Sequence, residues 1–258
     1  MASSTHRTWL KRLLLLAAHH SPLALRALTT LRPVDRTEFK NSGRWEPEYR
    51  EGGWDWLWDS REAIHHQVIA AYCKPLHGKA AILDVGCGEG VLHDALRGVG
   101  YGRYVGIDLS ETAIGRAARS ADGQTLFMVA KAETFETAER FNLIVINECL
   151  YYLQDPPSLL ARLAGFLEPD GAFVISMAMG NLNEGLLMLG IWRDLERDFL
   201  VRDEISLLHD GGPVRIIKTL QPRRLHGQST TRPPNARTRQ TDTRQTTTTT
   251  DNPQRSHM

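Results

Sequence analysis

The chain has 258 residues, 41% of them hydrophobic, and a formal net charge of +1 at pH 7. This length suits one α/β domain with short additions, and the near-zero charge argues against nucleic acid as a partner. The three cysteines, Cys73, Cys87 and Cys149, form neither a paired framework nor a C-x-x-C motif. They favour a reducing compartment, so we expect a cytoplasmic protein without disulfides.

The N-terminal residues predict a helical arm that leads into a loop. Residues 9–18 and 23–31 read as two helices, and residues 32–53 read as a loop with aromatic anchors. Basic residues precede the apolar run Leu13–Ala18, but this run of six is too short for a signal peptide or a membrane span. We expect a mobile arm or lid, and the alternative is a peripheral contact with a membrane surface.

A tryptophan-rich segment, Trp54–Trp58, precedes a predicted helix at Ser60–Cys73. Its tryptophans are candidates for covering a ligand, with ordinary core packing as an equal alternative. The helix carries His65 and His66, which are adjacent and therefore point to different parts of its surface. We expect at most one of these histidines to face a pocket.

The most informative stretch is residues 80–90, A-A-I-L-D-V-G-C-G-E-G. It predicts a buried strand at Ala80–Val85, a glycine turn and a helix at Val91–Arg97. The spacing G-x-G-x-G differs from the G-x-G-x-x-G of pyrophosphate-binding turns. Asp84, two residues before the first glycine, would repel a pyrophosphate and attract a cation. A nucleoside ligand with an ammonium group and no phosphate fits this pattern, and S-adenosylmethionine is such a ligand.

The sequence L-D-V-G-C-G-E-G at residues 83–90 closely resembles the first motif of the class I S-adenosylmethionine-dependent methyltransferases. The resemblance covers about residues 80–220. It implies an α/β fold, a Rossmann-like doubly wound sheet of seven strands that ends in an antiparallel hairpin. It also implies S-adenosylmethionine as cofactor, held at this turn by Asp84, Gly86, Cys87 and Gly88.

The second predicted strand, Tyr104–Leu109, places an acid where such a cofactor presents its ribose. Asp108 lies 22 residues beyond Gly86 (108 − 86), and an acid at that spacing accepts hydrogen bonds from a ribose diol. The resemblance assigns this contact to Asp108 and the neighbouring Leu109. The alternative for Asp108 is a carboxylate that caps the following helix, Glu111–Arg119, although Ser110 is itself a good cap.

The third predicted strand, Leu126–Ala130, leads to a departure from the family pattern. Relatives usually carry an acid at the position of Lys131, and that acid accepts a hydrogen bond from the adenine amino group. An ammonium only donates, so Lys131 does not replace it. We expect Glu133, or backbone groups around Ala132, to hold the adenine.

The fourth predicted strand, Phe141–Asn147, runs into the sequence E-C-L-Y-Y-L. By the resemblance, the Asn147 backbone carbonyl accepts from the ammonium of the cofactor, and Glu148, Tyr151 and Tyr152 lie near the methyl group. Similar segments occur in relatives that act on small molecules. The N-P-P-Y segment of base-methylating relatives is missing, which again argues against nucleic acid.

The remaining predicted elements alternate in the same way. They are a helix at Pro156–Leu167, a turn at Glu168–Gly171, a strand at Ala172–Met177, a helix at Asn181–Asp194, and a hairpin of Phe199–Leu208 with Val214–Leu220. We expect Met179, Asn181 and Trp192 to face the substrate. From Gln221 the chain is basic and rich in threonine, with almost no large apolar residues, and we expect disorder there.

These patterns divide the chain into a helical arm and aromatic loop at 1–53, a methyltransferase domain at 54–220 and a disordered tail at 221–258. The predicted function is transfer of a methyl group from S-adenosylmethionine to an O, N or C atom of a small metabolite by in-line displacement. A base is needed only where the acceptor must lose a proton. Candidates for it are Glu148, Tyr151, His65 and His66, and no catalytic residue is assigned.

Two other functions stay open at this point. The chain is alternatively a non-catalytic member that binds the cofactor or a partner, a reading that Lys131 keeps open. An NAD-dependent oxidoreductase is disfavoured by Asp84 and by the glycine spacing. No cluster of metal-ligating residues is recognisable in the sequence, so we expect no metal.

Overall fold

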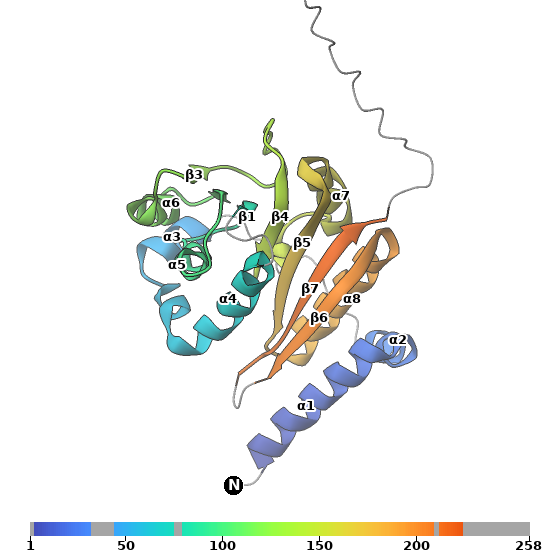
Figure 1. Cartoon of the computed structure of the whole chain (residues 1–258). Coiled ribbons are helices and arrows are strands. Elements are labelled where there is room, and N and C mark those ends of the chain that lie inside the picture. The colour runs from blue at the N-terminus through green and yellow to red at the C-terminus, as the bar shows by residue number, and fades with distance from the viewer. Residues whose placement is uncertain (1–2, 32–43, 75–78, 209–211, 224–258) are drawn as a thin grey trace, which may run out of the picture. The chain divides into compact units, whose positions relative to one another are not determined.

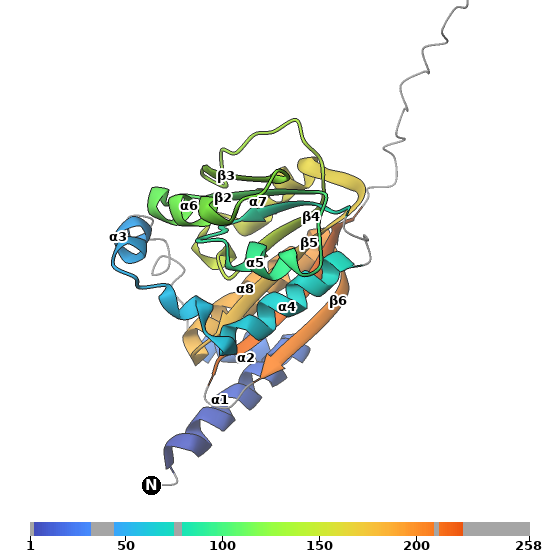
Figure 2. The same ribbon diagram turned by 60° about the vertical axis from the view of Figure 1, so that its left-hand side comes forward.

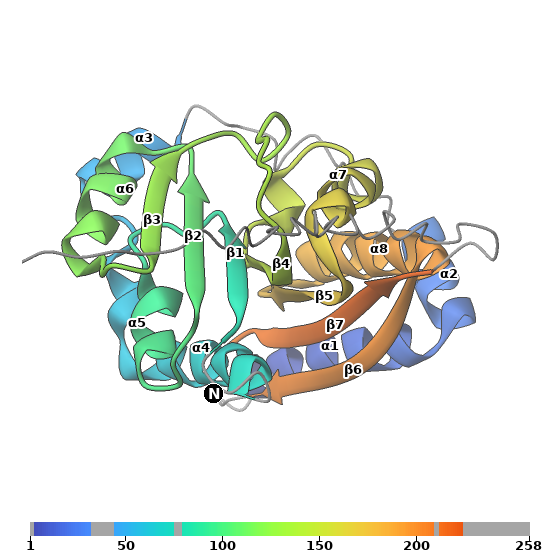
Figure 3. The same cartoon turned by 45° about the horizontal axis from the view of Figure 1, so that its top comes forward.

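One mixed sheet organises the computed structural model, which describes residues 3–31, 44–74, 79–208 and 212–223. Its seven strands lie in the order β3-β2-β1-β4-β5-β7-β6 (Figure 1, Figure 3). The strands are β1 Ala81–Val85, β2 Arg103–Asp108, β3 Thr125–Val129, β4 Phe141–Asn147, β5 Leu167–Met179, β6 Phe199–Leu208 and β7 Val214–Pro222.

The strand directions confirm the doubly wound fold. β3, β2, β1, β4 and β5 pair in parallel, whereas β7 is antiparallel to both β5 and β6. The chain moves outward from β1 to β2 and β3 and then returns to β4 on the other side of β1. At such a reversal the connections leave in opposite directions, so a crevice opens at the carboxyl ends of β1 and β4.

Helices cover both faces of this sheet. The helices are α1 Ser3–His20, α2 Pro22–Leu31, α3 Trp45–Arg50, α4 Ser60–Cys73, α5 Val91–Arg97, α6 Glu111–Ala117, α7 Pro156–Leu163 and α8 Leu182–Asp198. One core forms where α4 and α5 pack on alternate sheet residues such as Ile82 and Val145. A larger core joins α7 and α8 to the other face, around residues such as Leu83 and Ile144. Figure 2 shows α4 and α5 in front of α8.

Part of the predicted loop at 32–53 is helical, so that expectation was wrong. Residues 45–50 form α3, and the following tryptophans form a 3-10 helix, η1, at Asp55–Trp58. Pro47 read as a loop signal, but proline is tolerated in the first turn of a helix. Glu46 fixes α3 to the body because its carboxylate accepts hydrogen bonds from the Ser110 and Thr112 hydroxyls. Residues 32–43 lie outside the described residues.

The other differences concern where elements end. The predicted turn at 168–171 is part of β5, which pairs irregularly: Phe141 faces Leu167 while Leu143 faces Ala172. The turn residues therefore sit in an irregular bulge of a continuous strand. Helix α8 runs four residues beyond the predicted end, α6 and α7 finish in 3-10 turns, and β7 includes Gln221 and Pro222. The predicted disorder of the tail otherwise falls outside the described residues.

The two predicted N-terminal helices are present and pack against the body. In α1, Leu15 and Ala18 are buried within the larger core, and the Arg12 guanidinium donates to the Gly212 carbonyl. The His19 ring bonds the Glu204 carboxylate on β6 over 2.6 Å. Within the described residues, every helix is too short or too polar to cross a membrane.

Candidate active site

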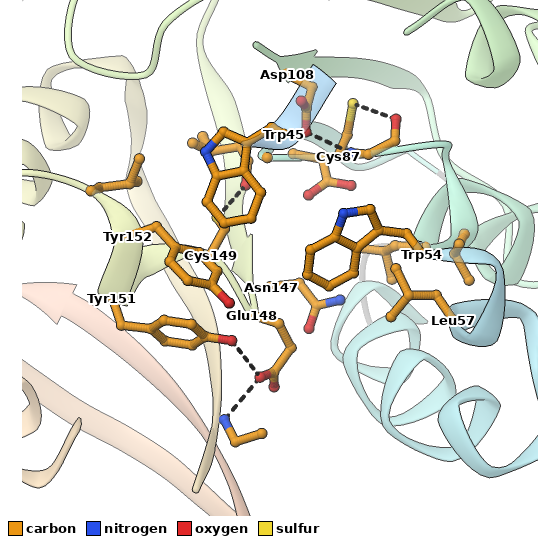
Figure 4. A pocket seen from close by; sticks show the side chains of 18 of the residues that line it. Trp45, Trp54, Leu57, Cys87, Asp108, Asn147, Glu148, Cys149, Tyr151 and Tyr152 are labelled. Carbon is orange, nitrogen blue, oxygen red and sulfur yellow. Dashed lines mark hydrogen bonds between the residues drawn. The ribbon is translucent and has the colours of Figure 1, made fainter. Parts of the chain in front are cut away.

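A cavity of about 500 Å³ opens at the carboxyl ends of β1, β2 and β4, where the reversal of the sheet predicts a ligand crevice (Figure 4). Every residue predicted from sequence to contact the cofactor lines it. These residues are Asp84, Gly86, Cys87, Gly88, Asp108, Leu109, Ala132, Glu133 and Asn147. The structure therefore brings together side chains and turns that are up to 63 positions apart in the chain (147 − 84).

The glycine turn has a backbone that other residues rarely adopt. Gly86 has φ 73° and Gly88 has φ 52°, both in the left-handed region. A Cβ at Gly86 would lie 2.6 Å from Cys149 Sγ, and one at Gly88 would lie 2.7 Å from Tyr49 Oη. Both positions thus need glycine for conformation and for space. The turn is held by the Gly86 and Cys87 amides, which donate to the Ile107 carbonyl.

Asp84 presents an unsatisfied acceptor to this cavity. Its side chain is 1% exposed, and Oδ2 accepts a 2.5 Å hydrogen bond from Tyr104 Oη. Oδ1 is buried and has no partner among the described residues, and the same is true of Asn147 Oδ1. Burial raises the pKa of the Asp84 carboxyl to about 7. Unpaired buried acceptors are costly, so this end of the cavity suits a ligand that carries cationic donors.

Asp108 is fixed at the end of β2. Its Oδ2 accepts from the Gly88 amide and its Oδ1 from the Ser110 amide, each over 3.0 Å. Ser110 Oγ, not Asp108, caps α6 by accepting from the Ala113 amide. Asp108 is therefore not the helix cap. Burial raises the pKa of its carboxyl, and its remaining lone pairs are available to a diol.

The third strand ends beside the same cavity. Ala130, Ala132 and Glu133 line it, whereas the Lys131 side chain is exposed and is not part of the lining. The residue that departs from the family pattern thus points away from the cavity. Glu133 and the backbone around Ala132 are the groups that the chain offers in place of the usual acid.

Aromatic rings from the segment before β1 cover the cavity. Trp45, Tyr49, Trp54 and Trp56 all line it, and Tyr152 joins them from the segment after β4. The Trp45 ring centroid lies 6.0 Å from that of Trp54 and 4.5 Å from that of Tyr152 (Figure 4).

Trp58 behaves differently from its neighbours. Its indole N–H donates to Glu89 over 3.4 Å, and the residue does not line the cavity. Trp45 and Tyr49, which sequence reasoning took only as loop anchors, are part of the cover. The glycine at position 88, which leaves room for the Tyr49 hydroxyl, is the one local sign of this contact.

Buried charges build the opposite end of the cavity. The Glu148 carboxylate accepts from Ser176 Oγ, from Arg215 Nε at 2.8 Å and from the Ala178 amide at 2.8 Å. Arg215 Nη2 also donates to Glu62 over 2.9 Å. Arg215 and Glu62 are both buried. This cluster joins α4, β7 and the end of β4, and sequence reasoning missed it because its members are far apart in the chain.

The candidate bases divide between the cavity and its surroundings. Glu148, Tyr151 and His66 line the cavity, whereas His65 does not. The His65 ring is fully buried between Glu62, whose Oε2 is 3.3 Å from Nδ1, and Asn147, whose Nδ2 is 3.5 Å from Nε2. As expected, only one of the two adjacent histidines faces the pocket.

The residues predicted to face the substrate from β5 and α8 do not line the cavity. Met179 and Trp192 are buried in the core, and the Lys218 ammonium lies 5.1 Å from the Trp192 ring. Asn181 caps α8 by accepting from the amides that follow it. The helix instead presents Glu184 and Met188 to the cavity, one and two turns further along.

Possible metal ligands gather at one place among the described residues, and it lies outside the cavity lining. His19, His20 and Glu204 have ligand atoms within 4.8 Å of one another. However, the Lys218 ammonium lies 2.9 Å from Glu204 Oε2 and neutralises the carboxylate charge that would otherwise attract a metal cation. This cluster consists of an ion pair within the hairpin, Lys218 with Glu204, and a hydrogen bond from His19 of the N-terminal arm to the same carboxylate.

Residues 57–207 match the protein family described as the methyltransferase domain. A curated relative, a ubiquinone biosynthesis O-methyltransferase of Thiobacillus denitrificans, is 36% identical over 118 residues, which are 44% of this chain and 50% of that protein. The chain thus spans about half the length of this relative.

Solved structures show the same fold. The N-methyltransferase NodS of Bradyrhizobium japonicum WM9, in complex with S-adenosyl-l-homocysteine, has a TM-score of 0.60 at 19% identity and covers 71% of this chain and 98% of its own. Magnesium protoporphyrin IX methyltransferase of Synechocystis PCC 6803 has a TM-score of 0.53 at 16% identity and covers 72% and 97%.

The fold and the glycine turn define a Rossmann-like enzyme of the class I type. The chain belongs to the methyltransferase family, and the family and fold class predicted from the motif at residues 83–90 are confirmed.

Proposed function

We propose that this chain transfers the methyl group of S-adenosylmethionine to a small-molecule acceptor. One observation carries the proposal: a single cavity joins the glycine turn and Asp108 at one end to the Glu148–Arg215 cluster at the other. A cofactor and an acceptor can therefore meet inside one cavity. When bound, the cofactor supplies a sulfonium methyl that is already activated for displacement.

The residues at the cofactor end fit this ligand group by group. Asp84 Oδ1 and Asn147 Oδ1 are buried acceptors without a donor, as a ligand with ammonium and sulfonium charges requires. Asp108 is oriented by two backbone amides and would hold the ribose diol. Glu133 and the backbone at Ala132 would hold the adenine.

The aromatic cover would align the acceptor with the cofactor and keep water out of the cavity. Displacement at a methyl group needs the acceptor atom in line with the leaving sulfur, so positioning is the main contribution of the protein. Trp45, Trp54 and Tyr152 enclose the cavity with rigid rings, and Met188 adds an apolar contact from α8. These groups would hold the acceptor against the cofactor and exclude solvent.

Calorimetric titration with S-adenosylhomocysteine tests the proposal. Wild-type protein should bind at micromolar concentration, and Asp108→Ala should weaken binding by ~1–3 kcal/mol, because a charge-assisted hydrogen bond is lost. Asp94→Ala is the matched control, since Asp94 is exposed on α5 and pairs with Arg97 at the surface. Absence of binding in wild type would contradict the proposal, and unchanged affinity in Asp108→Ala would remove Asp108 from the site.

The alternative of a non-catalytic member loses its main support. It was kept open by Lys131, whose side chain is exposed and outside the cavity lining. The polar lining at both ends of the cavity also favours an enzyme, because a partner-binding protein has no need of a buried charged cluster facing a ligand space.

A further inference from the structure

His66 presents a basic nitrogen to the cavity. Its Nδ1 lies 2.9 Å from the Glu62 backbone carbonyl, which only accepts hydrogen bonds. Nδ1 therefore carries the proton, and the lone pair of the neutral ring is on Nε2. The ring lines the cavity, and Nε2 has no hydrogen-bond partner among the described residues.

Arg215 presents a donor to the same end of the cavity. Nε donates to Glu148 and Nη2 donates to Glu62, which leaves Nη1. Nη1 is buried and has no partner among the described residues, and the residue lines the cavity while only 2% exposed. A buried guanidinium nitrogen without an acceptor is a costly arrangement unless a ligand supplies one.

Glu62 places these two groups beside each other. Its backbone carbonyl fixes the His66 ring, and its carboxylate fixes the Arg215 guanidinium. The other ionisable groups around them are His65 on α4 and Glu148 at the end of β4. Burial, with the nearby Arg215 charge, lowers the pKa of His66 to about 4, so the imidazole is neutral near pH 7.

We propose that His66 and Arg215 bind the hydroxyl group of an aromatic acceptor, and that His66 removes its proton. A hydroxyl donates to His66 Nε2 and accepts from Arg215 Nη1 through the same oxygen. A carboxylate would accept from Arg215 but would face the His66 lone pair, and an ammonium would face the Arg215 charge. This inference rests on the proposed methyltransferase function, and it names the substrate class and the base.

The aromatic part of the proposal comes from the cavity wall. Trp45, Trp54 and Tyr152 enclose the space that leads to the charged cluster, and flat rings stack well against such walls (Figure 4). The other candidate bases are committed elsewhere. Both Glu148 oxygens already accept hydrogen bonds, and the Tyr151 hydroxyl donates to Glu148 over 3.4 Å.

The proton transfer balances within these groups. The acceptor O–H bond breaks, the oxygen keeps the electron pair, and the proton forms an N–H bond at His66 Nε2. The product pair is an aryloxide beside an imidazolium, with Arg215 Nη1 donating to the oxygen. The aryloxide that forms raises the pKa of the adjacent imidazole, so the product ion pair holds the transferred proton on His66.

The test uses 4-nitrophenol, because its phenolate absorbs visible light and its neutral form does not. Protein saturated with S-adenosylhomocysteine is titrated at a pH at which most of the free phenol is neutral. Binding should produce the phenolate band. 4-Nitroanisole, which has the same ring and no hydroxyl proton, should compete at least about tenfold more weakly.

Two variants separate the roles. His66→Gln should lose the phenolate band by about fivefold or more and keep its affinity for S-adenosylhomocysteine, and Arg215→Lys should reduce the band while keeping the charge. The control is His20→Gln, since His20 is exposed on α1. An unchanged band in His66→Gln would overturn the base assignment. Wild-type protein that binds S-adenosylhomocysteine but not 4-nitrophenol would overturn the substrate class alone, whereas failure to bind S-adenosylhomocysteine would overturn the proposed function.

Discussion

The two ends of the cavity are built in different ways. The cofactor end uses residues close in the chain, mostly at 84–90 and 108–109, and its shape comes from backbone turns. The opposite end, where we propose that the acceptor binds, uses Glu62, Glu148 and Arg215. Glu62 and Arg215 are 153 positions apart in the chain, and the shape of this acceptor end comes from buried ion pairs.

This difference has a physical consequence. Other residues are strained in a glycine turn and crowd the space around it, so a substitution there distorts the backbone that faces the ligand. In a buried ion pair the two charges compensate each other. Removing one member leaves an uncompensated buried charge, which lowers the stability of the fold. Substitutions at the two ends should therefore report on different quantities: cofactor affinity at one end and stability at the other.

The largest effect is expected for Arg215→Met. This change leaves the buried Glu62 and the half-buried Glu148 without their cation, which should lower the free energy of unfolding by ~3–5 kcal/mol. Denaturant unfolding followed by circular dichroism measures it. Arg97→Met is the control, because Arg97 pairs with Asp94 at the surface and its loss should change stability by less than about 0.5 kcal/mol.

A second substitution sharpens this result. If uncompensated charge is the cause, Glu148→Gln in the Arg215→Met background should restore part of the lost stability, because one buried carboxylate is then neutral. Equal stability of the single and double variants would show instead that Arg215 acts by packing.

At the cofactor end, Gly88→Val should act on binding. The new Cβ would meet Tyr49 Oη at 2.7 Å, and the residue would keep a positive φ that β-branched side chains avoid. We expect the affinity for S-adenosylhomocysteine to fall by ~100-fold, about 3 kcal/mol. Calorimetry measures this loss, with Gly123→Ala as control because a Cβ there meets nothing within 4 Å. A loss below about threefold would mean that Tyr49 moves freely.

The same contrast explains what the sequence predicted. The strand, the turn and Asp108 follow from local spacing, because glycine conformation and strand period are short-range properties. The cover was only partly predicted: Trp54 and Trp56 were candidates, but Trp45 and Tyr49 act through α3, whose docking depends on Glu46 meeting α6. The Arg215 cluster was missed, because nothing in β7 marks one arginine of a hairpin as the partner of a helix far upstream.

The residues that were predicted to face the substrate show a second limit of prediction from sequence. Met179 and Trp192 were expected to face the substrate, but large apolar side chains are also those that a core needs most. Both are in the core, and α8 turns Glu184 and Met188 toward the cavity. The rotation of a helix about its axis is set by its packing, which a single sequence leaves open where apolar residues are consecutive, as at residues 186–189.

The Asp84 carboxyl should make cofactor binding depend on pH. Burial raises its pKa to about 7, so the group changes from mostly protonated to mostly ionised between pH 6 and 8. A cationic ligand needs the ionised form, so affinity for S-adenosylmethionine should rise by about tenfold over this range and then level off. In the ligand-free protein the sign is opposite: a raised carboxyl pKa stabilises the fold at low pH, and this stability is lost as the pH rises through 7.

Calorimetry in buffers of different ionisation enthalpy measures both the affinity and the proton released. Asp84→Asn is the matched variant, since it keeps the shape and removes the titration. It should bind with an affinity that no longer changes with pH. A wild-type affinity that is constant from pH 6 to 8 would contradict an unpaired, protonated Asp84 in the free protein.

The smallest effect is expected for Glu46→Gln in α3, the helix that carries Trp45 and Tyr49 of the aromatic cover. The Glu46 carboxylate binds the Ser110 and Thr112 hydroxyls, and these bonds lower its pKa to about 2, so it is ionised throughout the neutral range. Glu46→Gln offers one oxygen in place of two, so α3 should dock less firmly and S-adenosylhomocysteine should dissociate faster, with an affinity loss of about threefold.

Stopped-flow fluorescence of the cover tryptophans would follow the release. Glu48→Gln is the control within the same helix, because Glu48 pairs with Arg44 rather than with α6. If both variants release the ligand at the wild-type rate, α3 is held by its aromatic contacts alone. A faster release in Glu46→Gln only would show that one local acid couples the cover to the ribose end. The cover would then belong to the cofactor half of the cavity, although its rings also enclose the acceptor.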